Sequence, residues 1–107
     1  MTDDAVARFL AGVYHAATFG EPGAAASLLR QQVQQLLQND DLEGIDTLLR
    51  DADPYRLASL DMRELLAVSL PHAEQLPSRV SFVQRCLPHL NKRLSQRERQ
   101  RILSGLC

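Results

Sequence analysis

The basic side chains of this 107-residue sequence gather near its C-terminus. Residues 79–107 contain seven basic residues and one acidic residue, a formal charge of +6, whereas residues 1–78 contain five basic and twelve acidic residues, a charge of −7. The seven basic residues are Arg79, Arg85, Lys92, Arg93, Arg97, Arg99 and Arg101. The net charge of −1 therefore conceals two parts of opposite sign.

Six of these seven side chains are arginines, whose planar guanidinium groups suit carboxylates and phosphates. Such a cluster is typical of a surface that docks an acidic protein or a nucleic acid. Phe82, in the same segment, adds an aromatic of the kind found in interface hot spots. We therefore expect a partner-binding set of Phe82, Arg85, Lys92, Arg93, Arg97, Arg99 and Arg101. Two alternatives stay open: the basic part balances the acidic part internally, and Phe82 packs under the preceding loop at Leu76.

Between the two kinds of partner, the composition favours a protein. Base recognition calls for aromatic or polar side chains beside the basic ones, and Phe82 is the single aromatic in the basic part. The helix expected after Ser95 is short for a recognition helix, and the chain as a whole is acidic. We expect a non-enzymatic adaptor, regulator or assembly factor that docks an acidic protein partner. The alternative is a small nucleic-acid-binding regulator, and self-association also stays open.

Metal binding has one weak signal, the spacing Cys86-Leu87-Pro88-His89. Zinc sites use such pairs, but one pair supplies half of a site. His72 and Cys107 are the other soft ligands in the C-terminal half, and they form no second pair of suitable spacing. We therefore expect Cys86 to be a core residue and the protein to need no metal or cofactor.

Catalysis has still less support. The sequence has no glycine-rich phosphate loop, no G-x-S-x-G and no H-E-x-x-H. Its neighbouring carboxylates precede expected helices, where aspartate acts as an N-terminal cap. We predict that the protein is not an enzyme.

The elements that carry these residues are expected to be helices. The chain has 19 leucines but only 6 valines and 2 isoleucines, and unbranched side chains lose little rotamer freedom in a helix. We predict one all-α domain over 1–107 with five to six helices, either a small bundle or a short stack of helical hairpins. The predicted helices are 2–17, 24–38, about 42–52, 61–70, 78–94 and 95–105, with a short turn at 55–60.

Polar residues at the expected helix starts and apolar residues at helical spacing complete the prediction. The expected caps are Thr2, Asp40, Asp53, Asp61 and Ser95, the last in a capping box with Glu98. The residues expected in the core are Phe9, Leu36, Ile45, Leu66, Val83 and Leu90. In segment 78–94 the predicted buried stripe is Val80, Val83, Leu87, Leu90 and Leu94, with Pro88 on the solvent side.

The cellular compartment is predicted from two features that the sequence lacks. No run of about 18 apolar residues is present, and the chain opens with Met1-Thr2-Asp3-Asp4 rather than a basic, apolar leader. We expect a cytoplasmic protein with two reduced cysteines, Cys86 and Cys107.

Overall fold

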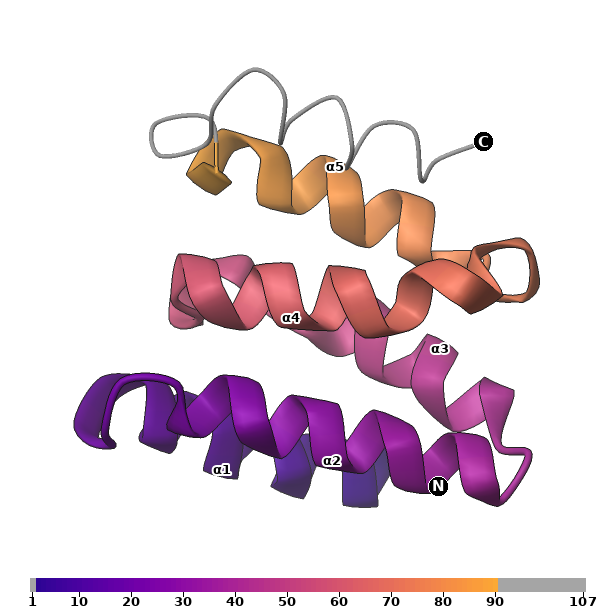
Figure 1. The fold of residues 1–107 in the computed structure, drawn as a ribbon, viewed down its shortest axis with the longest axis horizontal. Coiled ribbons are helices and arrows are strands. Elements are labelled where there is room, and N and C mark those ends of the chain that lie inside the picture. Colours follow the sequence, from indigo (N-terminus) through magenta and orange to yellow (C-terminus); the bar gives the residue numbers. More distant parts are fainter. Residues whose placement is uncertain (1, 91–107) are drawn as a thin grey trace.

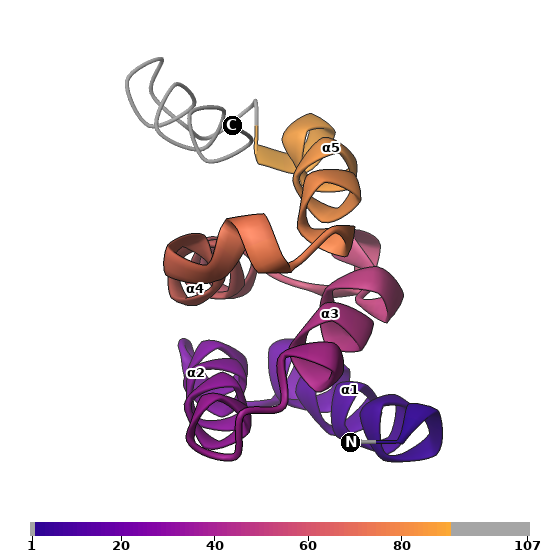
Figure 2. The same ribbon diagram turned by 90° about the vertical axis from the view of Figure 1, so that its right-hand side faces the viewer.

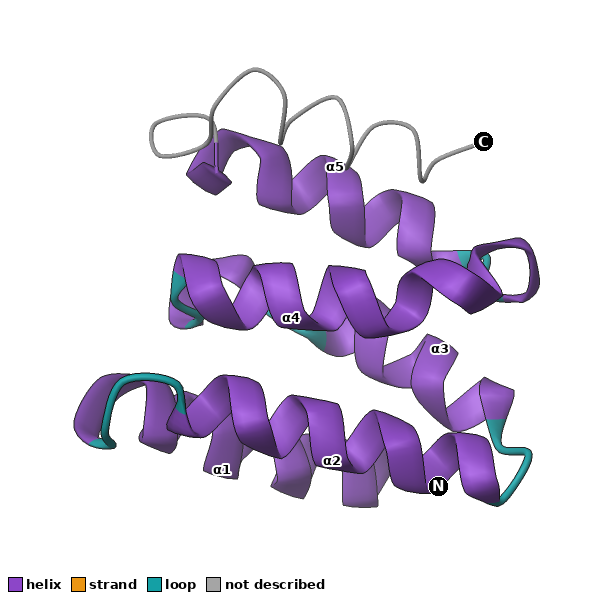
Figure 3. Cartoon of the chain, in the orientation of Figure 1, coloured by secondary structure: helices purple, strands orange, loops and turns teal. Residues whose placement is uncertain are grey.

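Helices account for most of the chain that the computed structural model describes, residues 2–90, and no strand occurs among them (Figure 3). The α-helices are α1 (Asp3–Phe19), α2 (Ala24–Gln38), α3 (Leu42–Asp51), α4 (Ser59–Ser69) and α5 (Ser78–Leu90). Two 3₁₀ helices, η1 (Pro54–Arg56) and η2 (Leu70–Gln75), precede and follow α4. The all-α prediction is confirmed, with five α-helices, and the helix predicted at 95–105 lies outside the described residues.

The five α-helices form a small bundle of two layers (Figure 2). α1, α3 and α5 lie side by side in one layer, and α2 and α4 lie side by side in the other. Successive α-helices alternate between the layers, so α1, α3 and α5 run in one direction and α2 and α4 in the other (Figure 1). The ends of α1, α3 and α5 therefore lie at the same end of the molecule as the starts of α2 and α4.

Short polar side chains begin several of these helices. Thr2 Oγ1 accepts a hydrogen bond from the backbone N–H of Ala5 at 3.2 Å, and Asp53 Oδ1 accepts one from that of Tyr55 at 3.0 Å. Both caps were predicted from the sequence, because a cap depends on residues within one helical turn.

Two predicted caps are wrong by position. The N-cap of α3 is Asp41 rather than Asp40, and its carboxylate accepts from the N–H of Gly44 at 2.9 Å. Asp61 lies inside α4, which begins earlier, and its carboxylate accepts from the N–H of Ala58 at 2.8 Å. Asp61 thus plays the part that glutamate plays at the third position of a capping box.

The glycine at position 44 has a steric explanation. A Cβ atom at position 44 would lie 2.7 Å from the nearer carboxylate oxygen of Asp41. The absence of a side chain lets the capping carboxylate approach the start of α3 closely, so this glycine belongs to the cap.

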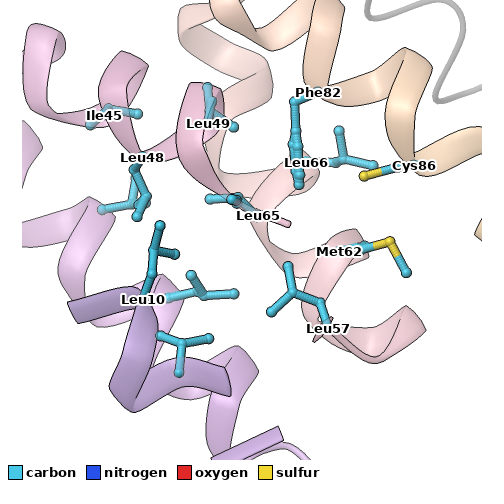
Figure 4. Packing of buried hydrophobic residues seen from close by; sticks show 14 of the residues in the cluster. Leu10, Ile45, Leu48, Leu49, Leu57, Met62, Leu65, Leu66, Phe82 and Cys86 are labelled. Atoms are coloured by element: carbon cyan, nitrogen blue, oxygen red, sulfur yellow. The ribbon is translucent and has the colours of Figure 1, made fainter. Parts of the chain in front are cut away.

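The core contains leucine and other apolar side chains from all five α-helices (Figure 4). The predicted core residues Leu36, Ile45, Leu66, Val83 and Leu90 are buried, and Phe9 is half-buried against the same cluster. Within residues 2–90, no helix combines the length and apolar character needed to cross a bilayer.

The buried face of α5 differs from the predicted stripe. Its buried residues are Arg79, Phe82, Val83, Cys86 and Leu90, whereas Val80 is 41% exposed and Leu87 is half-buried. Apolar spacing alone does not predict this face, because it includes a charged residue, Arg79. Pro88 faces solvent, as predicted, and Leu94 lies outside the described residues.

Candidate interaction surface

Phe82, the predicted aromatic anchor for a partner, is completely buried. It belongs to the core cluster that also contains Leu76, Val83 and Cys86 (Figure 4). A side chain without exposed surface makes no contact with an outside partner in this fold. The assignment of Phe82 to the partner-binding set is therefore wrong, since its position on α5 faces the other helices.

Arg85, the second predicted partner residue, binds the C-terminal end of α3. Its guanidinium donates hydrogen bonds to the backbone carbonyls of Leu49 at 2.7 Å, Ala52 at 2.7 Å and Arg50 at 3.2 Å. These carbonyls belong to the last turn of α3 and its cap, where acceptors lack partners within the helix and the helix dipole favours a cation. Arg85 thus has a role in the fold. The residue is half-buried, and its assignment as a partner contact stays a prediction.

Arg79 does the same at the end of α4. Its Nη2 donates to the carbonyl of Leu66 at 2.8 Å and its Nε donates to Ser69 Oγ at 2.9 Å. The residue is only 3% exposed, and desolvation lowers the pKa of its guanidinium. Two basic residues of the C-terminal part are therefore used to join α5 to the ends of α3 and α4.

The other five predicted partner residues, Lys92, Arg93, Arg97, Arg99 and Arg101, lie outside the described residues. We call residues 92–101 the basic segment. Residues 2–90 contain seven basic and twelve acidic residues, a charge of −5, whereas residues 91–107 contain five basic residues and one acidic residue, a charge of +4. The charge division therefore persists after Arg79 and Arg85 are assigned to the fold.

One surface feature escaped the sequence analysis, a pair of rings formed by Tyr55 of η1 and His89 of α5. Tyr55 is 85% exposed, and the two ring centroids lie 4.4 Å apart at an interplanar angle of 85°, an edge-to-face arrangement. The closest sequence signal is an aromatic residue in the short turn Asp53-Pro54-Tyr55-Arg56. The pairing itself joins positions 34 residues apart, which no local pattern reveals.

Tyr14 of α1 holds η1 in position through two contacts. Tyr14 Oη accepts a hydrogen bond from the N–H of Asp53 at 2.9 Å, and the guanidinium of Arg56 lies 4.5 Å from the centroid of the Tyr14 ring. Burial raises the pKa of Tyr14, so its hydroxyl stays protonated at neutral pH. Contacts on both sides of Tyr55 therefore hold the turn that presents it.

Two shallow hollows adjoin the ring pair and share a wall of Pro54, Tyr55, Pro88 and His89. The α3-side hollow, of about 330 Å³, is also lined by Asp51, Ala52, Asp53 and Arg85. The α4-side hollow, of about 290 Å³, is also lined by Leu57, Ala58, Ser59 and Met62. An exposed aromatic side chain between two hollows is suited to recognising a side chain of another molecule.

Cys86 and His89, whose spacing is the one weak metal-binding signal of the sequence, have different surroundings. Cys86 is buried in the core, and burial raises the pKa of its thiol to about 12. His89 packs against Tyr55 at the surface. Within residues 2–90, no three or more histidine, cysteine or acidic side chains are grouped so that they could hold a metal ion.

The arrangement thus offers an exposed ring pair, two adjoining hollows and, in the sequence directly after α5, a basic segment. Searches for related proteins add no second example of it: no protein-family model, no curated protein and no solved structure matches this chain.

Proposed function

We propose that the protein is a non-enzymatic interaction module, an adaptor, regulator or assembly factor that docks the acidic surface of a partner protein. Lys92, Arg93, Arg97, Arg99 and Arg101 supply the contacts. The observation that supports this proposal is the charge division, −5 in residues 2–90 against +4 in residues 91–107.

The roles of Arg79 and Arg85 narrow the proposal. Both guanidinium groups bind backbone oxygen atoms at helix ends, so the fold uses these two arginines for cohesion. The basic segment that follows contains five cations and one carboxylate, Glu98. Exposed ion pairs within a molecule contribute only about 0–1 kcal/mol each, so internal neutralisation is a weak reason for such a concentration.

Charge reversal in the basic segment tests the proposal. The test variant is Arg97→Glu/Arg101→Glu, and the matched control is Arg8→Glu/Arg30→Glu, which makes the same charge change at two exposed arginines of α1 and α2. Each protein is cross-linked in nuclease-treated extract of the native host, and captured proteins are quantified by mass spectrometry. Circular dichroism checks that each variant keeps its helicity.

We expect an acidic protein that the parent and the control capture equally and that the test variant captures at least tenfold less. Like charges facing each other across an interface cost several kcal/mol, which is sufficient for that loss. A set of captured proteins that does not depend on Arg97 and Arg101 contradicts the proposal. Binding that disappears with nuclease treatment also contradicts it and assigns the basic segment to nucleic acid.

A further inference from the structure

We propose that the α3-side hollow binds an arginine side chain from a basic segment of another protein. The hollow is formed by the end of α3, by η1 and by the last turn of α5, all within residues 2–90. The inference goes beyond the proposed function, which concerns the basic segment and an acidic partner. It adds a second site, for a partner of opposite charge, and an adaptor that joins two proteins requires two such sites.

The size and lining of the hollow fit the stem of an arginine side chain. Its volume of about 330 Å³ lies at the lower end of the roughly 300–1,000 Å³ of ligand pockets, so it suits one side chain. Most of the surface that the hollow exposes is apolar, and Ala52, Pro54 and Pro88 line it. Arginine buries its methylene groups along apolar surface while its charged end meets water or a polar group.

Tyr55 offers an aromatic ring to the guanidinium group. The residue is 85% exposed, although the ring of His89 and the hydrogen bond from its N–H to Asp53 hold it in place. A guanidinium group within about 6 Å of the centre of a tyrosine ring is attracted by the negative face of that ring, and its planar shape allows stacking. The protein already contains such a contact, because the guanidinium of Arg56 lies 4.5 Å from the centroid of the Tyr14 ring.

Two acidic residues of the lining, Asp51 and Asp53, favour a cation. Asp51 is also bound by Arg50, whose Nε lies 2.9 Å from its Oδ1, so Asp53 is the main acceptor for the ligand. Asp53 Oδ1 accepts a hydrogen bond from the N–H of Tyr55, and a carboxylate accepts several hydrogen bonds at once. Hydrogen bonds between a guanidinium group and a carboxylate are short and strong because both groups are charged.

Arg85 also lines the hollow, but its positive charge is offset within the protein. Its two terminal nitrogens donate to the carbonyls of Ala52 and Leu49, each at 2.7 Å, at the end of α3 where the helix dipole is negative. Residues 2–90 as a whole carry a charge of −5, which attracts a basic partner from a distance. Charge and lining therefore favour the same occupant.

Short synthetic peptides test this site without knowledge of the natural partner. The probes are five-residue peptides, blocked at both ends, in which four serines surround a central arginine, citrulline or norleucine. Citrulline has the shape of arginine without its charge, and norleucine has only the apolar stem. The full chain, isotope-labelled, is titrated with each peptide, and its backbone amide signals are followed by nuclear magnetic resonance.

The test variants are Tyr55→Ala, Tyr55→Phe and Asp53→Asn, which removes the charge but keeps a residue that caps η1. The control for the ring is Phe19→Ala, because Phe19 is 76% exposed, also lies beside a histidine and lines neither hollow. The control for the charge is Glu43→Gln, at an exposed position in the first turn of α3. Circular dichroism checks that each variant keeps its helicity.

We expect the parent to bind the arginine peptide at least tenfold more tightly than either other peptide, with shifts of the amide signals of Ala52, Asp53 and Tyr55. Tyr55→Ala and Asp53→Asn should each lower this preference to threefold or less, whereas Tyr55→Phe and both controls should keep it. Equal binding of the arginine and citrulline peptides, or of the arginine and norleucine peptides, overturns the site. A preference that Glu43→Gln lowers as much as Asp53→Asn belongs to the acidic surface as a whole and also overturns it.

Sedimentation of the protein without peptide identifies the source of the arginine. We expect a monomer, because the occupant comes from another protein. Self-association that is lost both in Asp53→Asn and in Arg97→Glu/Arg101→Glu would assign the hollow to a second copy of this chain and overturn the proposed source. Failure of the peptide test leaves the proposed function intact, since that function depends on the basic segment and is tested by charge reversal there.

Discussion

The guanidinium of Arg79 donates a hydrogen bond from its Nε to the hydroxyl of Ser69, 2.9 Å away. The same hydroxyl donates to the carbonyl of Leu65 at 2.7 Å. Both residues are buried, and Nη2 of the arginine reaches the carbonyl of Leu66. A polar network of side chains and backbone therefore joins the last turn of α4 to the first turn of α5.

Substitution of Ser69 by alanine should destabilise the protein by about 1–3 kcal/mol, because it removes the acceptor of a buried donor. Ser81→Ala is the matched control, since Ser81 lies on α5 and is exposed. The measurement is urea unfolding followed by circular dichroism. Equal midpoints for Ser69→Ala and Ser81→Ala would show that the network contributes nothing to stability.

Arg85→Met should lower the free energy of unfolding by about 2 kcal/mol, because three carbonyls at the end of α3 lose a charged donor. Arg8→Met, at an exposed position of α1, should stay within about 0.5 kcal/mol of the parent. Urea unfolding gives both values, and amide hydrogen exchange should show faster opening at the end of α3. A fully stable Arg85→Met that fails to bind a partner would show that Arg85 contributes to partner binding rather than to stability.

Phe82→Ala should cost about 3–5 kcal/mol, as expected for removal of a completely buried aromatic side chain. Val80→Ala should be nearly neutral, because Val80 is partly exposed on the same helix. The midpoints of thermal unfolding of the two variants show which residue of α5 contributes more to stability: Phe82, on the face buried in the structure, or Val80, on the face predicted from apolar spacing. A larger loss for Val80→Ala than for Phe82→Ala would favour the predicted stripe.

Stability should fall in alkaline solution partly because of Cys86. Its thiol has a pKa of about 12 in the folded protein and about 8.5 when unfolded, so the folded state retains the proton over that interval. The unfolded state then binds fewer protons, and the free energy of unfolding falls by up to about 1.4 kcal/mol per pH unit between the two values. Below pH 8 the contribution is constant. The measurement is urea unfolding from pH 7 to 11 in a Cys107→Ser background.

Cys86→Ala in the same background is the control, and its alkaline slope should be shallower than that of the parent thiol. The buried thiol should also react slowly with maleimide at pH 8 in the native state and rapidly in urea. Parallel pH curves for the two proteins, together with rapid native labelling, would contradict the burial of this thiol.

Sequence reasoning succeeded where a feature depends on nearby residues. The caps at Thr2 and Asp53, the boundaries of α2 and most of the leucine core follow from short-range patterns. It failed where a distant helix end supplies the partner. Arg79 and Arg85 carry the composition of a docking surface, and only the positions of α3 and α4 show that backbone carbonyls satisfy them.

The candidate interaction surface could not be predicted from short-range sequence patterns either, because its residues are also distant from one another in the sequence. Tyr55 follows Asp53 and Pro54, two residue types common in turns, and nothing in that short stretch shows that the N–H of Asp53 donates to Tyr14 Oη of α1 or that Tyr55 is 85% exposed. In the sequence His89 is notable only for its spacing from Cys86, whereas in the structure its ring packs against that of Tyr55. The contact between Tyr55 of η1 and His89 of α5 depends on how the helices pack in the two layers.

The alternation of α-helices between those layers also bears on how the chain folds. Most close packing in the described residues joins a helix to the next one along the chain or to the next but one. Helical bundles fold in about microseconds to milliseconds, faster than most proteins built from sheets. On the ribosome, α1, α2 and α3 can therefore pack together before α5 has been synthesised. Arg79 and Arg85 of α5 then donate hydrogen bonds to carbonyls at the ends of α4 and α3, which have already formed.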